Sequence, residues 1–428
     1  MNNLETGDAL AKAAATAPDS KGHQVHFARQ PIFDGRLEVY GYEMLFRESP
    51  QNEAAITPGS QAGKIATARV MLNSIMDLDV EKLTEGKMAF FNLSREFLLD
   101  DNGLLLNGTN IGVELLSSAG TGSEVVRALE VLALQGVVIA LDDFSWQAGI
   151  EQLLDSAALV KLDIQKADRA WLASTIIRLR NWPVKLVAQK VETQEEFAWC
   201  KAQGFDYFQG YFLCKPTVVE QQRLPDSKIN TLRLIAELQK PDITPEDLEA
   251  VIRNDMALHY RLLRTVNSTY YGLSVEVKSI GHAVVILGMA TVKRWAHLQL
   301  VAGSDDTPAE IIRQALIRAR MCEQLIPTLP KETRDTAFTT GMFSLLEAIL
   351  DSPMTLIVSQ LPLDQDMADA LTRHEGPFGR LLKAVIAYEQ GQWDELDNSL
   401  FSTDDLAACY LEAVQWAREQ FDELSRET

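Results

Sequence analysis

Short apolar runs alternate with longer amphipathic stretches from about residue 26 to residue 216. The runs are rich in branched and aromatic residues and are bounded by polar or turn-forming residues, which is typical of strands. The stretches between them repeat apolar residues at helical spacing. We predict strands over residues 40–47, 87–94, 110–116, 136–144, 158–164, 184–191 and 207–212, and helices over 59–78, 122–135, 168–180 and 193–204.

Asp34 and Gly35 stand between two strand-like runs at the start of this series, which predicts a β-hairpin. Beyond the hairpin, the repeated alternation of strand and helix predicts a parallel sheet. The number of units favours closure of that sheet into a (β/α) barrel of the TIM type. The predicted fold class of the first half is therefore α/β.

The strand signals end near residue 216, and residues 215–230 have the composition of a connector. Thr244, Pro245 and the acids after them predict a helix start, and we expect Asp255 to cap the next helix. Residues 278–303 predict two short helices joined at Gly288, and helical spacing also covers residues 309–326, 343–350, 379–393 and 404–424. We therefore expect a flexible leader over residues 1–25, a barrel over 26–220 and an all-α domain over 221–428.

The chain has 428 residues, of which 46% are hydrophobic, and a net charge of −20. An acidic surface repels phosphate backbones, so nucleic acid is not expected as a partner. The cysteines (Cys200, Cys214, Cys322 and Cys409) form no CxxC pair, which favours reduced thiols. The N-terminus lacks the apolar stretch of a signal peptide, and no apolar run has the length needed to cross a bilayer. We expect a cytoplasmic protein that is not embedded in a membrane.

Polar residues stand near the carboxyl ends of the predicted barrel strands, where active sites of this architecture lie. They are Glu43, Arg47, Asn92, Glu114, Asp142, Asp143, Lys161, Asp163 and Gln209. Carboxylates gathered at one rim need a cation, and oxygen ligands of this kind suit Mg²⁺ or Mn²⁺. Two such metals can activate water against a phosphodiester, with a Lys or Arg near the phosphate.

Simpler interpretations exist for each of these residues. Glu43 and Arg47 can form an ion pair on a solvated strand face. The Asp142–Asp143 pair can cap the following helix, and the Asn92–Leu93–Ser94 segment can start another helix. The hypothesis of a shared site depends on convergence across successive strands.

The ordered motifs QPI…GYEMLFR, FNLS, VELL, LDDF, VKLDI, VET and DYFQGYF…KP resemble those of the EAL domain over residues 26–216. That resemblance implies a barrel with cyclic-di-GMP phosphodiesterase activity. It implies metal ligation by Glu43, Asn92, Glu114, Asp142 and, for a second metal, Asp143. It further implies that Lys161 orients water or the leaving group, that Arg47 contacts a phosphate and that Gln209 contacts substrate.

The chain departs from the EAL pattern at the catalytic step. It has AQKVET where active relatives have roughly AEGVET, so Gln189 replaces the acid expected to act on the catalytic water. Lys190 replaces a Gly, and Ser145 and Trp146 replace Gly-Thr in the loop after the acidic pair. General base catalysis contributes about 10²–10⁴-fold, so we predict a degenerate barrel that binds ligand without useful turnover.

The helical half resembles the HDOD domain in the segments IRNDMALHYRLLRTVNS and SIGHAVVILG. This resemblance implies a protein-interaction module. None of the six histidines precedes an Asp, and His259, His282 and His297 lie apart from convergent acids, so metal catalysis is not expected there. Residues 279–295 also imitate a helix-turn-helix, with Lys293 and Arg294 on the second helix, although apolar residues dominate both helices and favour a packed pair.

These observations together predict a signal-transduction protein. Its degenerate EAL barrel is expected to act as a sensor of cyclic-di-GMP or as a scaffold that has lost the ligand, and its HDOD domain to relay the state of the barrel to a protein partner. The alternative is an active metal-dependent cyclic-di-GMP phosphodiesterase. Homodimer formation is left open by the sequence.

Overall fold

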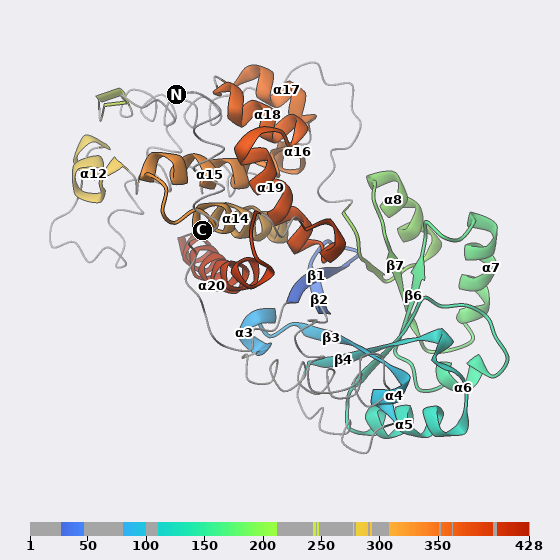
Figure 1. The fold of residues 1–428 in the computed structure, drawn as a ribbon. Coiled ribbons are helices and arrows are strands. Elements are labelled where there is room, and N and C mark those ends of the chain that lie inside the picture. Colours follow the sequence, from blue (N-terminus) through green and yellow to red (C-terminus); the bar gives the residue numbers. More distant parts are fainter. Residues whose placement is uncertain are drawn as a thin grey trace. The chain divides into compact units, whose positions relative to one another are not determined.

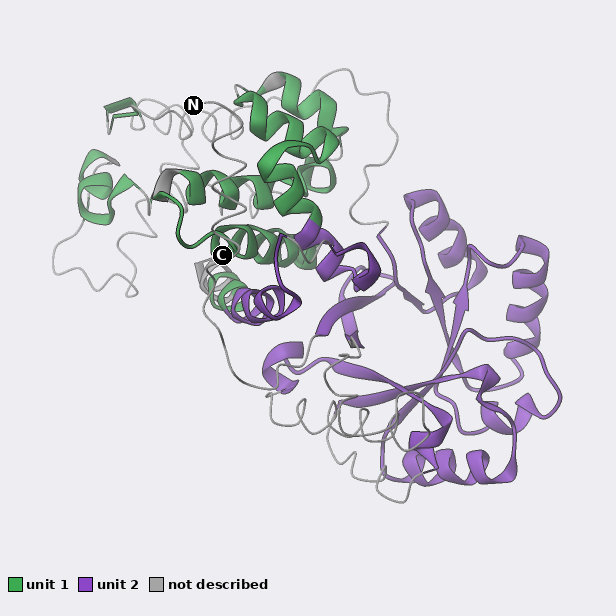
Figure 2. Ribbon diagram, viewed as in Figure 1, with its two compact units in different colours: residues 1–16, 216–383, 416–428 green, residues 17–215, 384–415 purple. Residues whose placement is uncertain are grey.

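The computed structural model divides the chain into two compact units (Figure 2). The barrel unit contains residues 17–215 and 384–415, and the helical unit contains residues 1–16, 216–383 and 416–428. The structure describes residues 27–46, 80–99, 110–211, 243–244, 246–247, 277, 280–289, 292, 308–350, 352–361, 363–396 and 400–427. The predicted leader, the predicted helix over 59–78 and the connector after residue 215 lie outside these residues.

The barrel unit is built on a closed barrel of strands in the order β1 to β8 (Figure 1). The strands are β1 (Phe27–Asp34), β2 (Val39–Phe46), β3 (Met88–Leu93), β4 (Ile111–Leu116), β5 (Val138–Asp142), β6 (Leu159–Asp163), β7 (Lys185–Gln189) and β8 (Tyr207–Phe208). The sequence-based prediction of a TIM-like barrel followed by an all-α part is confirmed. The barrel is not wholly parallel, because β1 runs antiparallel to both β2 and β8.

The predicted hairpin joins β1 to β2. Asp34 Oδ1 accepts hydrogen bonds from the backbone N–H groups of Arg36 and Glu38, at 2.8 and 3.0 Å. An Asp side chain that bonds the backbone beyond it stabilises a tight turn. The hairpin reverses the chain without a helix, which explains why β1 and β2 are antiparallel.

Short helices connect the parallel strands. They are α3 (Val80–Thr84), α4 (Arg95–Leu98), α5 (Ser123–Leu134), α6 (Ile150–Leu154), α7 (Arg169–Leu179) and α8 (Gln194–Gln203). Ser94 caps α4, which confirms a helix start after Asn92, and Thr193 and Glu196 form a capping box at α8. Helix α6 begins after Gly149 without a side-chain cap, so the interpretation of Asp142 and Asp143 as its caps is wrong.

An apolar layer fills the barrel interior. Ile32, Phe90, Ala140, Leu159 and Val187, each from a different strand, form one cluster of buried residues. A Cβ atom on Gly112 of β4 would lie 2.4 Å from the Phe90 ring, so the ring occupies the space that this glycine leaves. Side chains therefore pack in layers, as in other barrels of this class.

The remaining helices are α12 (Ile280–Leu287), α14 (Ala309–Gln324), α15 (Lys331–Phe343), α16 (Leu346–Leu350), α17 (Met354–Gln360), α18 (Gln365–Arg373), α19 (Gly376–Glu389) and α20 (Thr403–Glu427). Thr244 Oγ1 accepts from the Asp247 N–H and Asp247 Oδ2 accepts from the Thr244 N–H, as the predicted helix start requires. Gly288 follows α12 with φ +77°, at the predicted junction. The predicted cap Asp255 and residues His259, Lys293, Arg294 and His297 lie outside the described residues.

The division into units does not follow chain order. Residues 384–415, which include the end of α19 and the first half of α20, belong to the barrel unit. The predicted barrel over 26–220 and helical domain over 221–428 remain a prediction from sequence. None of the helices in the described part of the chain combines the length and apolar character of a membrane span.

Candidate functional site

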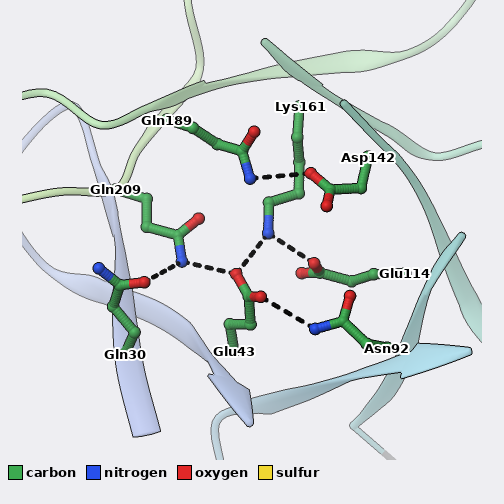
Figure 3. Close-up of polar contacts among 8 residues, drawn as sticks. All are labelled: Gln30, Glu43, Asn92, Glu114, Asp142, Lys161, Gln189 and Gln209. Atoms are coloured by element: carbon green, nitrogen blue, oxygen red, sulfur yellow. Dashed lines mark hydrogen bonds and ion pairs between the residues drawn. The ribbon is translucent and has the colours of Figure 1, made fainter. Parts of the chain in front are cut away.

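A polar layer lies directly above the apolar layer, toward the carboxyl ends of the parallel strands (Figure 3). Five of its members stand two positions along their strands from a residue of the buried apolar cluster, so alternation turns both side chains toward the interior: Gln30 from Ile32, Asn92 from Phe90, Asp142 from Ala140, Lys161 from Leu159 and Gln189 from Val187. The labelled members are Gln30, Glu43, Asn92, Glu114, Asp142, Lys161, Gln189 and Gln209. Of the predicted site residues, the structure therefore brings together Glu43, Asn92, Glu114, Asp142, Lys161, Gln189 and Gln209; Asp143 and Asp163 are not among them.

Lys161 on β6 stands at the centre of this polar layer. Its Nζ atom donates to Glu43 Oε2 and to Glu114 Oε2, at 2.6 Å in each case. All three side chains are buried. The Glu114 Oε1 atom is also buried and has no hydrogen-bond partner among the described residues. One ammonium group on β6 therefore bonds the carboxyl groups of Glu43 on β2 and Glu114 on β4.

Amide side chains complete the bonds of Glu43. Asn92 Nδ2 donates to Glu43 Oε1 at 3.0 Å, and Gln209 Nε2 donates to Glu43 Oε2 at 2.8 Å. The same Gln209 nitrogen donates to Gln30 Oε1 at 3.0 Å. Gln30 was not predicted as a site residue, although a Gln within the apolar strand FARQPIFD and opposite Glu43 in the hairpin was a usable signal.

Gln189 lies at the end of β7, and its Nε2 atom donates to Asp142 Oδ1 at 2.8 Å. A carboxylate only accepts hydrogen bonds, so the amide must present its N–H₂ group to Asp142. A Glu at this position would bring a second negative charge beside Asp142 and would need a cation between them. The substitution thus replaces a possible metal contact with a direct hydrogen bond.

The pKa values follow from this crowding of charge. Burial raises the pKa of Glu114 to about 8; Lys161 opposes the rise, and the carboxylates of Glu43 and Asp142 add to it. Burial also acts to raise the pKa of Glu43, but Lys161, Gln209 and Asn92 outweigh it and lower that pKa below the ordinary value. Burial acts to lower the pKa of Lys161, yet the surrounding carboxylates raise it. Lys161 is therefore a cation. The raised pKa of Glu114 indicates that a second cation beside its carboxyl group would also be stabilised.

Two lysines neutralise the acids at the outer rim. Lys166 Nζ lies 2.9 Å from Asp143 Oδ1, and Lys190 Nζ lies 2.8 Å from Asp163 Oδ2. Lys190 adopts φ +57°, a left-handed conformation that favours the Gly of the family pattern. Hydrogen bonds to Lys190 and to the backbone N–H groups of residues 165 and 166 lower the pKa of Asp163, although burial opposes this effect.

Trp146 fixes the loop that follows the acidic pair. Its Nε1 atom donates to Thr175 Oγ1 of α7 at 3.2 Å, and the Arg178 guanidinium carbon lies 3.5 Å from the centroid of its ring system. Phe144 and Trp182 also contact it edge-on or at a tilt. The residues that depart from the EAL pattern here attach the loop to a neighbouring helix.

The donor chemistry suits one divalent cation better than two. Carboxylate and amide oxygens come from four adjacent strands, and the unpartnered Glu114 Oε1 atom is a buried acceptor of the kind that Mg²⁺ or Mn²⁺ binds. On the other side, the amide donor of Gln189 and the Lys166 ammonium face Asp142 and Asp143, which does not fit a second cation. Within the described residues, no three His, Cys, Asp or Glu side chains gather at metal-ligand spacing.

The remaining site residues are placed as follows. Asn92 is exposed, Asp142 and Gln189 are half-buried, and Asp143 is exposed at the rim. The predicted phosphate contact Arg47 follows β2 immediately and lies outside the described residues. The roles predicted for all of these residues remain predictions.

Comparison with known proteins identifies both parts of the chain. The sequence pattern of the EAL domain matches residues 12–216, and that of the HDOD domain matches residues 224–349. The chain is 30% identical to the uncharacterized protein YuxH of Bacillus subtilis (strain 168) over 411 residues, which cover 93% of this chain and 99% of YuxH. It is also 30% identical to the cyclic di-GMP phosphodiesterase CdgJ of Vibrio cholerae serotype O1 over 405 residues, 93% of each chain.

Similar solved structures cover part of this chain. The Bacillus subtilis YkuI protein, with an EAL domain, in complex with c-di-GMP and calcium, matches with a TM-score of 0.38 and 18% identity, over 60% of this chain and 74% of that one. The Klebsiella pneumoniae BlrP1 complex with calcium and cyclic-di-GMP matches with a TM-score of 0.37 and 21% identity, over 46% of this chain and 57% of that one. With two domain patterns in order and two full-length relatives, the chain belongs to the family of proteins in which an EAL domain is followed by an HDOD domain.

Proposed function

We propose that this protein is a cyclic-di-GMP sensor whose EAL barrel binds the dinucleotide without useful hydrolysis, and whose HDOD domain passes the bound state to a protein partner. The observation that carries the proposal is the Gln189 amide, which donates to Asp142 where a proton acceptor is expected. The relay rests on the HDOD match and names no partner.

Hydrolysis of a phosphodiester needs a group that takes a proton from the attacking water. A carboxamide cannot take that proton, and the N–H₂ group of Gln189 is already bonded to a carboxylate. Asp143 is paired with Lys166. Asp163 is paired with Lys190, and its lowered pKa makes it a weaker base than a free carboxylate. A missing general base lowers the rate by about 10²–10⁴-fold.

Binding of cyclic-di-GMP requires fewer side chains than its hydrolysis, and most of the side chains that binding would use are present. Glu43, Asn92, Glu114 and Asp142 would hold one Mg²⁺ or Mn²⁺, which supplies a positive charge for a phosphate oxygen when bound. Gln209, whose buried Oε1 atom has no partner among the described residues, offers an acceptor beside them. Lys161 keeps Glu43 and Glu114 in place from below.

The second candidate is an active cyclic-di-GMP phosphodiesterase. It is favoured by the match to CdgJ, whose printed name assigns this activity to a protein that aligns over 93% of the present chain. Both candidates share the ligand and differ in turnover, so one set of variants separates them.

The test combines calorimetry with product analysis on full-length protein. Cyclic-di-GMP is titrated in Ca²⁺ to measure affinity, and incubated in Mn²⁺ to detect the linear dinucleotide. We expect wild type to bind and to release essentially no product, and we expect Gln189→Glu with Lys190→Gly to release product. Gln189→Leu is the matched control, because it removes the amide without restoring a proton acceptor.

Two outcomes contradict the proposal. Product release by wild type that disappears in Glu43→Ala establishes the second candidate. If wild type does not bind cyclic-di-GMP although circular dichroism shows an intact fold, cyclic-di-GMP is excluded as the ligand in both candidate functions.

A further inference from the structure

The seam that closes the barrel is short. In the described strands, β1 pairs with β8 only at Phe33–Phe208 and Asp34–Tyr207, whereas it pairs with β2 from Phe27 onward. Because β1 is antiparallel to β2, Phe27 lies at the end of the barrel that carries the polar layer. The backbone groups on the open edge of β1 there need partners other than a strand.

Two tyrosines from the end of the chain supply those partners. Tyr388 of α19 donates its hydroxyl to the Phe27 carbonyl at 3.1 Å, and the Arg29 N–H donates to the Tyr410 hydroxyl of α20 at 3.2 Å. Phe27 and Arg29 are two residues apart, so their backbone groups face the same edge of the strand. Both tyrosines are buried, at 0% and 2% exposure. A buried backbone group left unpaired would cost about 1–3 kcal/mol.

Ring packing and a close backbone approach reinforce these two bonds. The Tyr410 ring lies 6.1 Å from the Phe27 ring and 5.4 Å from the Tyr388 ring, measured between centroids. Gly391, in the turn after α19, approaches Leu45 of β2 so closely that a Cβ atom would lie 2.9 Å from Leu45 Cδ1. Residues 384–415, which we call the C-terminal clasp, therefore contact both strands of the hairpin.

The clasped part of β1 leads directly to the polar layer (Figure 3). Gln30 follows Arg29 and is the register partner of Glu43. Its Oε1 atom accepts from Gln209, and the same Gln209 nitrogen donates to Glu43. A shift of β1 along or away from β2 therefore moves Gln30, which accepts a hydrogen bond from the Gln209 side chain. The position of Gln209 in turn affects Glu43, to which Gln209 also donates.

We propose that Tyr388 and Tyr410 are positioning residues for the Glu43 site, which they act on through β1, Gln30 and Gln209. These two positioning residues would add to the proposed function, and the proposal rests on that function only for the identity of the ligand. The barrel site is thus completed by a segment that follows the HDOD match in the chain (Figure 2). The competing interpretation is a purely structural contact that leaves the polar layer unchanged.

The test uses Tyr388→Phe and Tyr410→Phe in the full-length chain, since Phe keeps the ring and removes only the hydroxyl. Hydrogen exchange is followed in peptides that cover residues 27–34 and 205–211, and cyclic-di-GMP affinity is measured in Ca²⁺. We expect exchange in both peptides to rise, and affinity to fall, by about three- to tenfold, which is the range for loss of one hydrogen bond. In the Gln30→Ala background, Tyr410→Phe should change neither the 205–211 peptide nor the affinity further.

Tyr40→Phe is the matched control. Tyr40 lies on β2, and its ring stacks on that of Tyr207 in β8 with 4.2 Å between the centroids. Both residues lie near the amino ends of their strands. We expect it to leave the exchange of residues 27–32 and the affinity unchanged. Faster exchange in residues 27–34 with an unchanged 205–211 peptide and affinity would overturn the proposal in favour of a structural contact. If wild type binds no dinucleotide, the proposed function fails, and the exchange of residues 205–211 still decides the role of the clasp.

Discussion

At the scale of single residues, Lys161 bridges the buried carboxyl groups of Glu43 and Glu114. We expect Lys161→Met to lower the free energy of unfolding by about 3–5 kcal/mol, because the buried Glu43 carboxylate then loses its counter-charge. Urea unfolding in EDTA measures this without a metal that could replace the ammonium. Lys185→Met, which breaks an exposed ion pair with Asp206, is the control and should change the value by less than about 1 kcal/mol. Equal effects would contradict a central role for Lys161.

Two buried cysteines give a pH-dependent expectation. Burial raises the pKa of Cys200 and of Cys322 to about 12. The thiolate is the reactive form, so at pH 9 only about one molecule in a thousand carries it at either site. We expect iodoacetamide to leave both cysteines unmodified in native protein at pH 9 and to modify both in urea, as read by peptide mass spectrometry. Modification of either one in native protein before the half-buried Cys409 would contradict this expectation.

At the scale of elements, the barrel layers depend on a glycine. Gly112→Ala would place a Cβ atom 2.4 Å from the Phe90 ring, and overpacking of this kind costs about 1–3 kcal/mol. We expect thermal unfolding at a lower temperature, and partial recovery when Phe90→Leu is added. Gly35→Ala is the control, since its Cβ atom would meet only Lys201 Cε, at 3.8 Å. Failure of Phe90→Leu to recover any stability would contradict the layered packing.

The strands of the barrel are the elements that the sequence predicts best. Alternation of apolar residues predicted the barrel strands, and their carboxyl-end residues predicted the polar layer, because strand geometry alone sets which side chains share a face. Helices α15, α17 and α18 were not predicted; α15 contains four threonines and a glycine, which are weak helix formers. Local pattern also could not predict that Lys161 bonds both acids, or that Tyr388 and Tyr410 bond β1, since these partners are remote in sequence.

At the scale of the whole molecule, the boundary predicted near residue 220 has a practical consequence. A fragment of residues 221–428 contains Tyr388 and Tyr410 without the β1 backbone groups that they bond. We expect this fragment to enhance the fluorescence of the dye ANS and to self-associate in size-exclusion chromatography, whereas the full-length chain does neither. A monomeric, dye-negative fragment would contradict this. Partner searches with the isolated fragment therefore need full-length protein as the reference.

The bonds of Tyr388 and Tyr410 also constrain how the chain is made. They join residues separated by 361 and 381 positions, so the first strand of the barrel meets these partners only after at least 361 further residues have been synthesised. Contacts between such distant positions slow folding. A premature stop codon at any position before Tyr388 would then leave β1 without these partners, even when every codon for the barrel strands had been translated.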